Sequence, residues 1–87
     1  MIDKEILKQA VDKWGELSQI EMMIEECSEL IMALQKMKRG YDNLDNIAEE
    51  IADVSLMMEQ GKYIFGEDLV NKHIDFKTER LKKRLEK

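Results

Sequence analysis

Two short stretches decide how this chain folds: Ile24-Glu25-Glu26-Cys27-Ser28-Glu29-Leu30 and Glu49-Glu50-Ile51-Ala52-Asp53-Val54. Each stretch has a helical pattern with two carboxylates three residues apart, so Glu26 and Glu29 share a helix face, as do Glu50 and Asp53. If the two helices pack side by side, these carboxylates converge. At about 5 Å spacing they repel by roughly 3 kcal/mol per pair at an effective dielectric of about 20. A hard divalent cation removes that repulsion, so we expect a magnesium or manganese site that handles phosphates.

Length and composition indicate a single helical domain spanning residues 1–87. The chain has no proline, four glycines and 38% charged residues, which suits an all-α fold. A chain this short buries a modest core, and oligomerisation would enlarge it. The net charge of −5 disfavours a nucleic acid polymer as partner. A nucleotide substrate remains compatible, because a metal can mediate between acidic groups and phosphates.

Cysteine usage and hydropathy indicate which cellular compartment to expect for the protein. Cys27 is the only cysteine, so an internal disulfide is impossible and the cysteine signatures of zinc sites are missing. We interpret Cys27 as a small apolar side chain rather than a nucleophile. The chain contains no run of about 18 apolar residues, so we expect no membrane span. The start of the chain does not resemble a secretory signal. These features favour the cytoplasm and no membrane partner.

Capping signals divide the chain into four expected helices. The first runs from near Asp3 to about Lys13, with Gly15 as its terminator. The second begins at a capping box of Ser18 and Glu21, with Leu17 and Met22 as a hydrophobic staple, and ends around residues 39–40. The third follows the turn at residues 40–43, where Asp42 or Asn43 can cap it, and extends to Gly66. The fourth runs from about Asp68 toward Glu86. The predicted architecture is a four-helix, all-α bundle.

The second and third helices each carry two stripes. One is an apolar seam with 3,4 spacing, as in a coiled coil. Beside it runs a strip in which two acids interrupt largely apolar residues, and unpaired charges are rarely buried. On the second helix the seam is Leu17, Ile20, Ile24, Cys27, Ile31 and Leu34, and the acid strip is Gln19, Met22, Met23, Glu26, Glu29, Leu30, Ala33 and Met37. On the third helix the seam is Leu44, Ile47, Ile51, Val54 and Met58, and the acid strip is Asn46, Glu50, Asp53 and Met57.

Residues beside these stripes receive less specific interpretations. Glu49 lies about 40° from Asp53 around its helix and can join the edge of the acid site. The solvent face of the second helix is expected to carry Ser18, Glu21, Glu25, Ser28, Gln35 and Lys36. Two apolar stripes on one helix exceed what a single small subunit can cover, so we expect a dimer. Trp14 and Met32 are candidate dimer contacts.

The fourth helix is basic on the side that we expect to lean inward. His73, Lys77, Arg80 and Arg84 lie beside an apolar stripe of Val70, Ile74, Leu81 and Leu85, while Lys72, Lys82 and Lys83 face outward. Acids that hold a metal and bases that reach distant phosphates are what polyphosphate chemistry requires. Two simpler explanations remain. The bases can be a solvated flank whose aliphatic stems cover apolar surface, and the acids can pair with Lys or Arg across a subunit seam.

In these residues the chain resembles the MazG-like, all-α nucleoside triphosphate pyrophosphohydrolases, and most closely their small single-domain members of phage type. The family hallmark is Glu-x-x-Glu on one helix and Glu-x-x-Asp on the next. Here these motifs are Glu26-Cys27-Ser28-Glu29 and Glu50-Ile51-Ala52-Asp53. The similarity covers most of the chain and includes Trp14-Gly15, Gln19, Lys38-Arg39-Gly40 and Lys77-x-x-Arg80. Either acidic motif alone is weak, and the ordered pair followed by a basic helix is more specific.

The resemblance implies a bundle completed by dimerisation, in some members as a dimer of dimers. It also implies cleavage between the α- and β-phosphates, which gives a nucleoside monophosphate and pyrophosphate. A housecleaning role on non-standard nucleotides and a dedicated role both stay open. Glu26, Glu29, Glu50 and Asp53 would bind magnesium and serve as the catalytic residues. Lys77 and Arg80 would hold the β- and γ-phosphates, and Gln19, about 10 Å along the helix from Glu26, would approach the sugar or base.

Two alternatives stay open, and a third, a di-iron bundle, is disfavoured. A related enzyme of the same superfamily would act on phosphoribosyl-ATP, dUTP or dCTP. A non-catalytic helical dimerisation module would use the paired acids and bases only to set its register. A di-iron carboxylate bundle usually needs Glu-x-x-His pairs, and His73, the single histidine, is not so placed.

Overall fold

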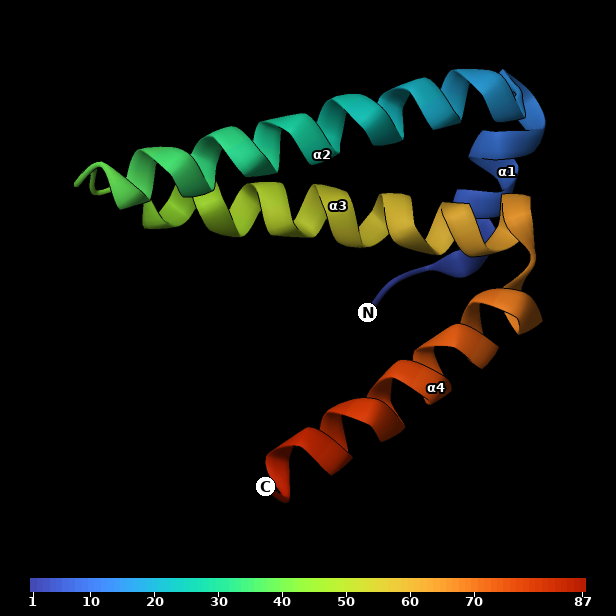
Figure 1. Cartoon of the computed structure of the whole chain (residues 1–87). Coiled ribbons are helices and arrows are strands. Elements are labelled where there is room, and N and C mark those ends of the chain that lie inside the picture. The colour runs from blue at the N-terminus through green and yellow to red at the C-terminus, as the bar shows by residue number, and fades with distance from the viewer.

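The computed structural model of residues 1–87 consists of four α-helices and contains no strand. In chain order they are α1 (Lys4–Trp14), α2 (Glu16–Lys38), α3 (Leu44–Phe65) and α4 (Glu67–Leu85). Figure 1 shows α2 and α3 lying side by side as an antiparallel hairpin, with α1 across the end where α2 begins and α3 finishes. The all-α class and the four-helix order predicted from the sequence are confirmed.

The predicted N-terminal cap is present on α1 and absent on α2. Asp3 caps α1, because its carboxylate accepts hydrogen bonds from the backbone N–H groups of Glu5 and Ile6 at 3.1 and 3.3 Å. The predicted capping box at Ser18 is wrong, since α2 already begins at Glu16 and no side chain caps it. Gly15 adopts φ 93°, which favours glycine, and this sharp turn lets α2 start without a cap.

The contact between α2 and α3 is polar where an apolar seam is expected. Gln19 and Ala33 are buried on α2, and Glu50, Met57 and Gln60 are buried on α3. All but Gln60 belong to the two strips that carry the acids. By contrast, most of the predicted seam is bare: Leu17, Ile24, Ile31, Leu34, Leu44, Ile51 and Met58 are exposed, and Ile20, Cys27, Ile47 and Val54 are half-buried. Within one chain, the acid strips therefore form the contact and the seams largely face outward.

Small and flexible residues explain why the acid strips pack together. Ala33 has a small side chain, and methionine adapts its shape to irregular gaps. Gly61 lies inside α3, where a Cβ would come within 3.2 Å of the methyl carbon of Met23. Asn43 ties the other end of the hairpin, because its side-chain amide donates a hydrogen bond to the carbonyl of Ala33 at 2.9 Å. These contacts allow the two backbones to approach closely along the acid strips.

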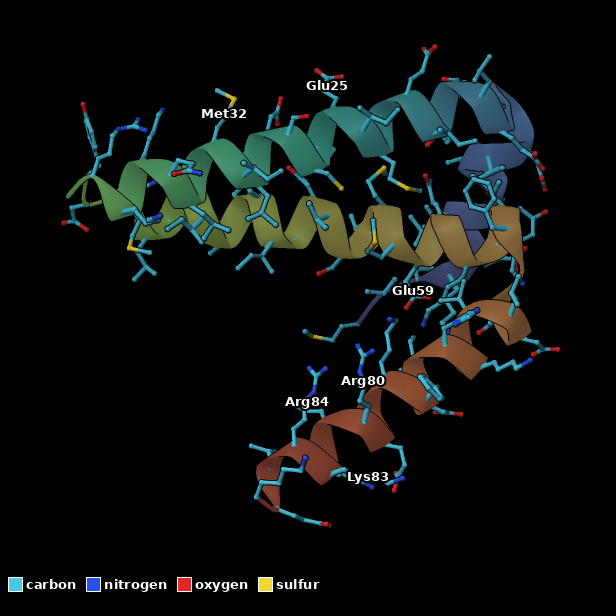
Figure 2. The ribbon with its side chains drawn as sticks, viewed as in Figure 1. Glu25, Met32, Glu59, Arg80, Lys83 and Arg84 are labelled. Atoms are coloured by element: carbon cyan, nitrogen blue, oxygen red, sulfur yellow. The ribbon has the colours of Figure 1, made fainter.

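Helix α4 diverges from the rest of the molecule. It packs against α3 near their junction at Gly66, where the backbone adopts φ 115° (Figure 1), and an ion pair between Lys4 and Glu67 links its first turn to α1. No residue of α4 is buried. Its basic row therefore makes no contact with α2, although Arg80 and Arg84 point to the side of α4 that faces the hairpin (Figure 2). None of the four helices is long and apolar enough to cross a membrane.

Candidate functional site

The hairpin of α2 and α3 brings the predicted carboxylates together. Oxygen atoms of Glu26, Glu29 and Glu50 lie within 4.8 Å of one another, and the same holds for Glu49, Glu50 and Asp53. Glu50 belongs to both groups, so the five side chains form one continuous cluster, which we call the acid cluster. Each acid reaches this point because helical spacing places it on the strip that faces the neighbouring helix. Glu49, which the sequence places at the edge of the site, joins the cluster.

Crowding of like charges changes the protonation of the cluster. Burial, followed by the negative charges of Asp53 and Glu29, raises the pKa of Glu26 to about 7. Burial and the neighbouring Glu29 also raise the pKa of Glu50. No lysine or arginine forms an ion pair with any of the five acids, since the three ion pairs of the chain lie elsewhere. Within one chain, the five acids therefore have no basic partner.

Two buried carboxylate oxygens in the cluster lack any hydrogen-bond partner. They are one oxygen of Glu26 and one of Glu50, whose side chain is 7% exposed. An unpartnered buried carboxylate is costly, and a bound cation would offset that cost. The donor atoms are carboxylate oxygens without sulfur or imidazole, which suits magnesium or manganese rather than zinc. The residues present fit the cation that the sequence predicts.

A shallow hollow opens beside the acid cluster. It has a volume of about 210 Å³ and lies between α2 and α3. Its lining consists of Glu29, Met32, Ala33, Lys36, Asn46 and Glu50. Lys36 is exposed, as expected for the solvent face, and it also lines this hollow, which the sequence did not predict. The available signal was the seven-residue spacing, because residues 29 and 36 differ by only about 20° around a helix.

The cations expected to hold phosphates lie away from the acid cluster. Lys77 and Arg80 are exposed on α4, which makes no contact with α2. Figure 2 shows Arg80 and Arg84 pointing to one side of α4 and Lys83 to the other, as the predicted division of basic residues requires. One chain in this arrangement does not bring Lys77 or Arg80 to the acids.

Gln19, the expected sugar or base contact, is buried. Its side chain is 2% exposed, and its amide nitrogen lies 3.7 Å from the sulfur of Met22. Contact with a nucleotide therefore requires Gln19 to become accessible. Trp14 and Met32, the candidate dimer contacts, are both 60% exposed. Figure 2 shows Met32 and Glu25 projecting from α2 away from α3.

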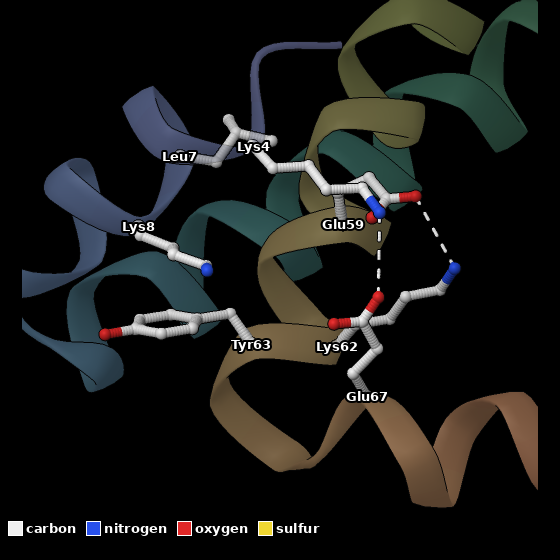
Figure 3. A pocket seen from close by; sticks show the side chains of 7 residues that line it. All are labelled: Lys4, Leu7, Lys8, Glu59, Lys62, Tyr63 and Glu67. Atoms are coloured by element: carbon white, nitrogen blue, oxygen red, sulfur yellow. Dashed lines mark hydrogen bonds and ion pairs between the residues drawn. The ribbon is translucent and has the colours of Figure 1, made fainter.

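A second cavity lies where α1, α3 and α4 meet, as Figure 3 shows. It has a volume of about 140 Å³, and its charged groups are largely paired. Lys4 forms an ion pair with Glu67 at 3.6 Å, and Lys62 forms one with Glu59 at 3.5 Å (Figure 3). Lys8 lies over the ring of Tyr63. We assign these contacts a structural role: the Lys4–Glu67 pair joins the start of α4 to α1, and the contact of Lys8 with Tyr63 joins α1 to α3.

The chain was compared with models of protein families, with curated proteins and with solved structures, and none of these comparisons gave a significant match.

Proposed function

We propose that this protein is a magnesium-dependent nucleoside triphosphate pyrophosphohydrolase that cleaves between the α- and β-phosphates. The observation that carries the proposal is the acid cluster, in which buried oxygens of Glu26 and Glu50 lack partners. Stable helical proteins rarely place several unpaired acids in a helix contact. The MazG-like order of motifs, Glu26-x-x-Glu29 before Glu50-x-x-Asp53, supports the same reaction.

Each residue of the site has a role in this proposal. Glu26, Glu29, Glu50 and Asp53 hold magnesium or manganese, and Glu49 adds a carboxylate at the edge of the cluster. The metal supplies charge neutralisation at the phosphates and lowers the pKa of a bound water. The half-buried setting of Glu26 limits access of bulk water and strengthens the electrostatic attraction to the cation. Lys77 and Arg80 hold the β- and γ-phosphates and stabilise the departing pyrophosphate.

The protein acts as a homodimer or as a dimer of such dimers. Exposed apolar residues support this part of the proposal, since Ile24 and Ile31 of the α2 seam are 63% and 58% exposed. Only three apolar side chains, those of Val11, Ala33 and Met57, are buried within one chain. Extensive apolar surface of this kind marks an interaction face. Lys77 and Arg80 would reach an acid cluster if α4 lies against a second copy or moves about Gly66.

A nucleotide panel tests the proposed reaction. The full-length protein is incubated with magnesium and with standard nucleoside triphosphates, dUTP, dCTP and phosphoribosyl-ATP, and pyrophosphate and phosphate are measured separately. We expect pyrophosphate and a nucleoside monophosphate from at least one substrate, and loss of turnover on chelation of the metal. Glu50→Gln should lower the rate at least about a hundredfold, because metal stabilisation of the transition state contributes several kcal/mol. Release of phosphate without pyrophosphate, or a Glu50→Gln variant as active as wild type, would refute the proposal.

The exposed seam also favours a second candidate, a helical dimerisation module without catalysis. Such a module needs the apolar residues Ile24 and Ile31 but not the acids. It should bind no magnesium, and its association should tolerate Glu26→Gln and Glu50→Gln. The enzyme proposal predicts the opposite result for magnesium, so the two candidates separate on a binding measurement that needs no substrate.

A further inference from the structure

The hollow beside the acid cluster holds a cation that has no partner. Lys36 lines it together with Glu29 and Glu50, yet the Lys36 ammonium forms no ion pair. Lys62 and Lys82, in contrast, each pair with a glutamate three residues earlier. The ammonium of a lysine that lines the hollow and forms no ion pair remains available to an anion. Within one chain, Lys36 is also the one basic residue that lines this hollow.

The second polar group of the hollow is an amide with its hydrogen-bond donors free. The side-chain oxygen of Asn46 accepts a hydrogen bond from the amide of Asn43 at 3.2 Å. Asn43 is itself fixed, because the same amide group also donates to the carbonyl of Ala33 at 2.9 Å. The NH₂ group of Asn46 therefore has no partner and is free to donate. One side of the hollow thus offers donors and the other side offers carboxylates.

We propose that Lys36 and Asn46 bind, within the same chain, the phosphate adjacent to the one held at the acid cluster. The hollow then receives the diphosphate portion of a magnesium-bound nucleotide, or pyrophosphate itself. The inference rests on the proposed function, because the acids must hold magnesium for an anion to approach them. The unpartnered oxygen of Glu50, in a side chain that is 93% buried and borders the hollow, independently indicates a ligand at this place.

The charges that line the hollow explain why it suits a phosphate better than a neutral ligand. Without a cation, the hollow is lined by two carboxylates of the acid cluster, Glu29 and Glu50, and repels anions. With magnesium bound, the carboxylate side is largely neutralised, and the ammonium of Lys36 then attracts a negative group. A diphosphate presents oxygens to both sides at once, with one phosphate on the metal and the next on Lys36 and Asn46. The hollow therefore selects phosphoric anhydrides over single phosphates.

The test measures binding of imidodiphosphate, a non-hydrolysable analogue of pyrophosphate, by calorimetry in the presence of magnesium. Lys36→Ala should weaken this binding about ten- to a hundredfold, the typical effect of losing a charge-assisted contact. Lys38→Ala is the matched control, since both lysines lie in the last turn of α2 and only Lys36 lines the hollow. Lys38→Ala should bind within about twofold of wild type. Thermal melts verify that both variants fold.

A second variant separates the anion contact from the metal site. Asn46→Asp keeps an oxygen for Asn43 but removes the NH₂ donors, so imidodiphosphate binding should weaken while binding of magnesium alone persists. Equal affinities of Lys36→Ala and Lys38→Ala, or no binding by wild type, overturn the inference. If wild type hydrolyses triphosphates and these affinities are equal, the inference fails and the proposed function stands. If imidodiphosphate binding depends on Lys36 but no triphosphate is hydrolysed, the proposed function fails and the inference stands.

Discussion

The α2–α3 hairpin and the C-terminal half of α4 differ in charge and in packing. Helices α2 and α3 carry ten acidic and three basic residues, whereas residues 77–85 of α4 carry five basic and one acidic residue. The hairpin buries carboxylates in its helix contact and leaves its apolar seams exposed. Helix α4 buries nothing. Neither arrangement suits a monomer that uses these helices only for stability, because each leaves a costly feature without compensation.

The hairpin and α4 lack two kinds of contact, one electrostatic and one apolar. The hairpin lacks positive charge at its acids and apolar cover on its seams. Helix α4 has positive charge and an exposed apolar stripe that includes Ile74 and Leu81. In the proposed function, magnesium would satisfy the first need of the hairpin, and a second copy of the chain would supply apolar cover on both parts. The predictions below test these contacts separately.

The largest effect is expected at the exposed seam of α2. Ile31→Glu places a charge where we propose that a partner packs, and a two-fold interface suffers the change twice. Full burial of an isoleucine contributes about 1.5–3 kcal/mol, so the dimer dissociation constant should rise at least about a hundredfold. Sedimentation over a concentration series measures this change. Ser18→Glu is the control on the opposite side of α2. A wild type that stays a folded monomer at micromolar concentration would disprove the dimer.

A smaller effect is expected on α4. Lys77→Ala or Arg80→Ala should lower triphosphate turnover about ten- to a hundredfold, since each removes a charge-assisted phosphate contact. Magnesium binding should remain nearly unchanged, because neither side chain lies near the acids. Lys82→Ala is the control, as Lys82 pairs with Glu79 on the opposite side of the helix. Steady-state kinetics and magnesium titrations are compared across the three variants. Full activity in both Lys77→Ala and Arg80→Ala would remove α4 from the site.

The pH dependence of stability is expected to be weaker still. The pKa of Glu26 is raised from 4.5 to about 7, so between these values the folded state binds more protons than the unfolded state. The free energy of unfolding should therefore fall as pH rises through this window. Without metal, the melting temperature should be higher at pH 5.5 than at pH 8 by roughly a few degrees. Glu26→Gln should flatten this difference. A wild type that is more stable at pH 8 would contradict the crowding of the acids.

Sequence periodicity predicted the elements and the acid cluster well, because both follow from spacing along single helices. Asp3 caps α1 as expected, and the three-residue spacing places Glu26 beside Glu29 and Glu50 beside Asp53 on their helices, where they join the acid cluster. The choice of packing face was less predictable. Periodicity shows that α2 has two stripes, but which stripe contacts α3 depends on how closely the backbones approach. Here that approach depends on Gly61 against Met23 and on Asn43, contacts between residues distant in sequence.

The placement of cations shows the same limit. Helical projection correctly separates Arg80 from Lys83, but it cannot show that α4 diverges after Gly66. Lys36 illustrates the converse, since its spacing from Glu29 was available in the sequence and its cavity was not. Distances between helices depend on turns such as Gly66, and a turn's direction is not encoded in the periodicity of its neighbours.

The central claim is that the acids of the α2–α3 hairpin hold magnesium, and thermal melting with and without magnesium tests it most directly. At 100 times its dissociation constant, a ligand of the folded state stabilises by about 2.7 kcal/mol, a melting shift on the order of 10 °C for a domain of this size. Glu26→Gln should melt no lower than wild type without metal, and it should lose most of the shift. Glu25→Gln, which projects away from α3, should keep it (Figure 2). No shift in wild type with a non-hydrolysable nucleotide present, or a shift lost only in Glu25→Gln, would contradict the account.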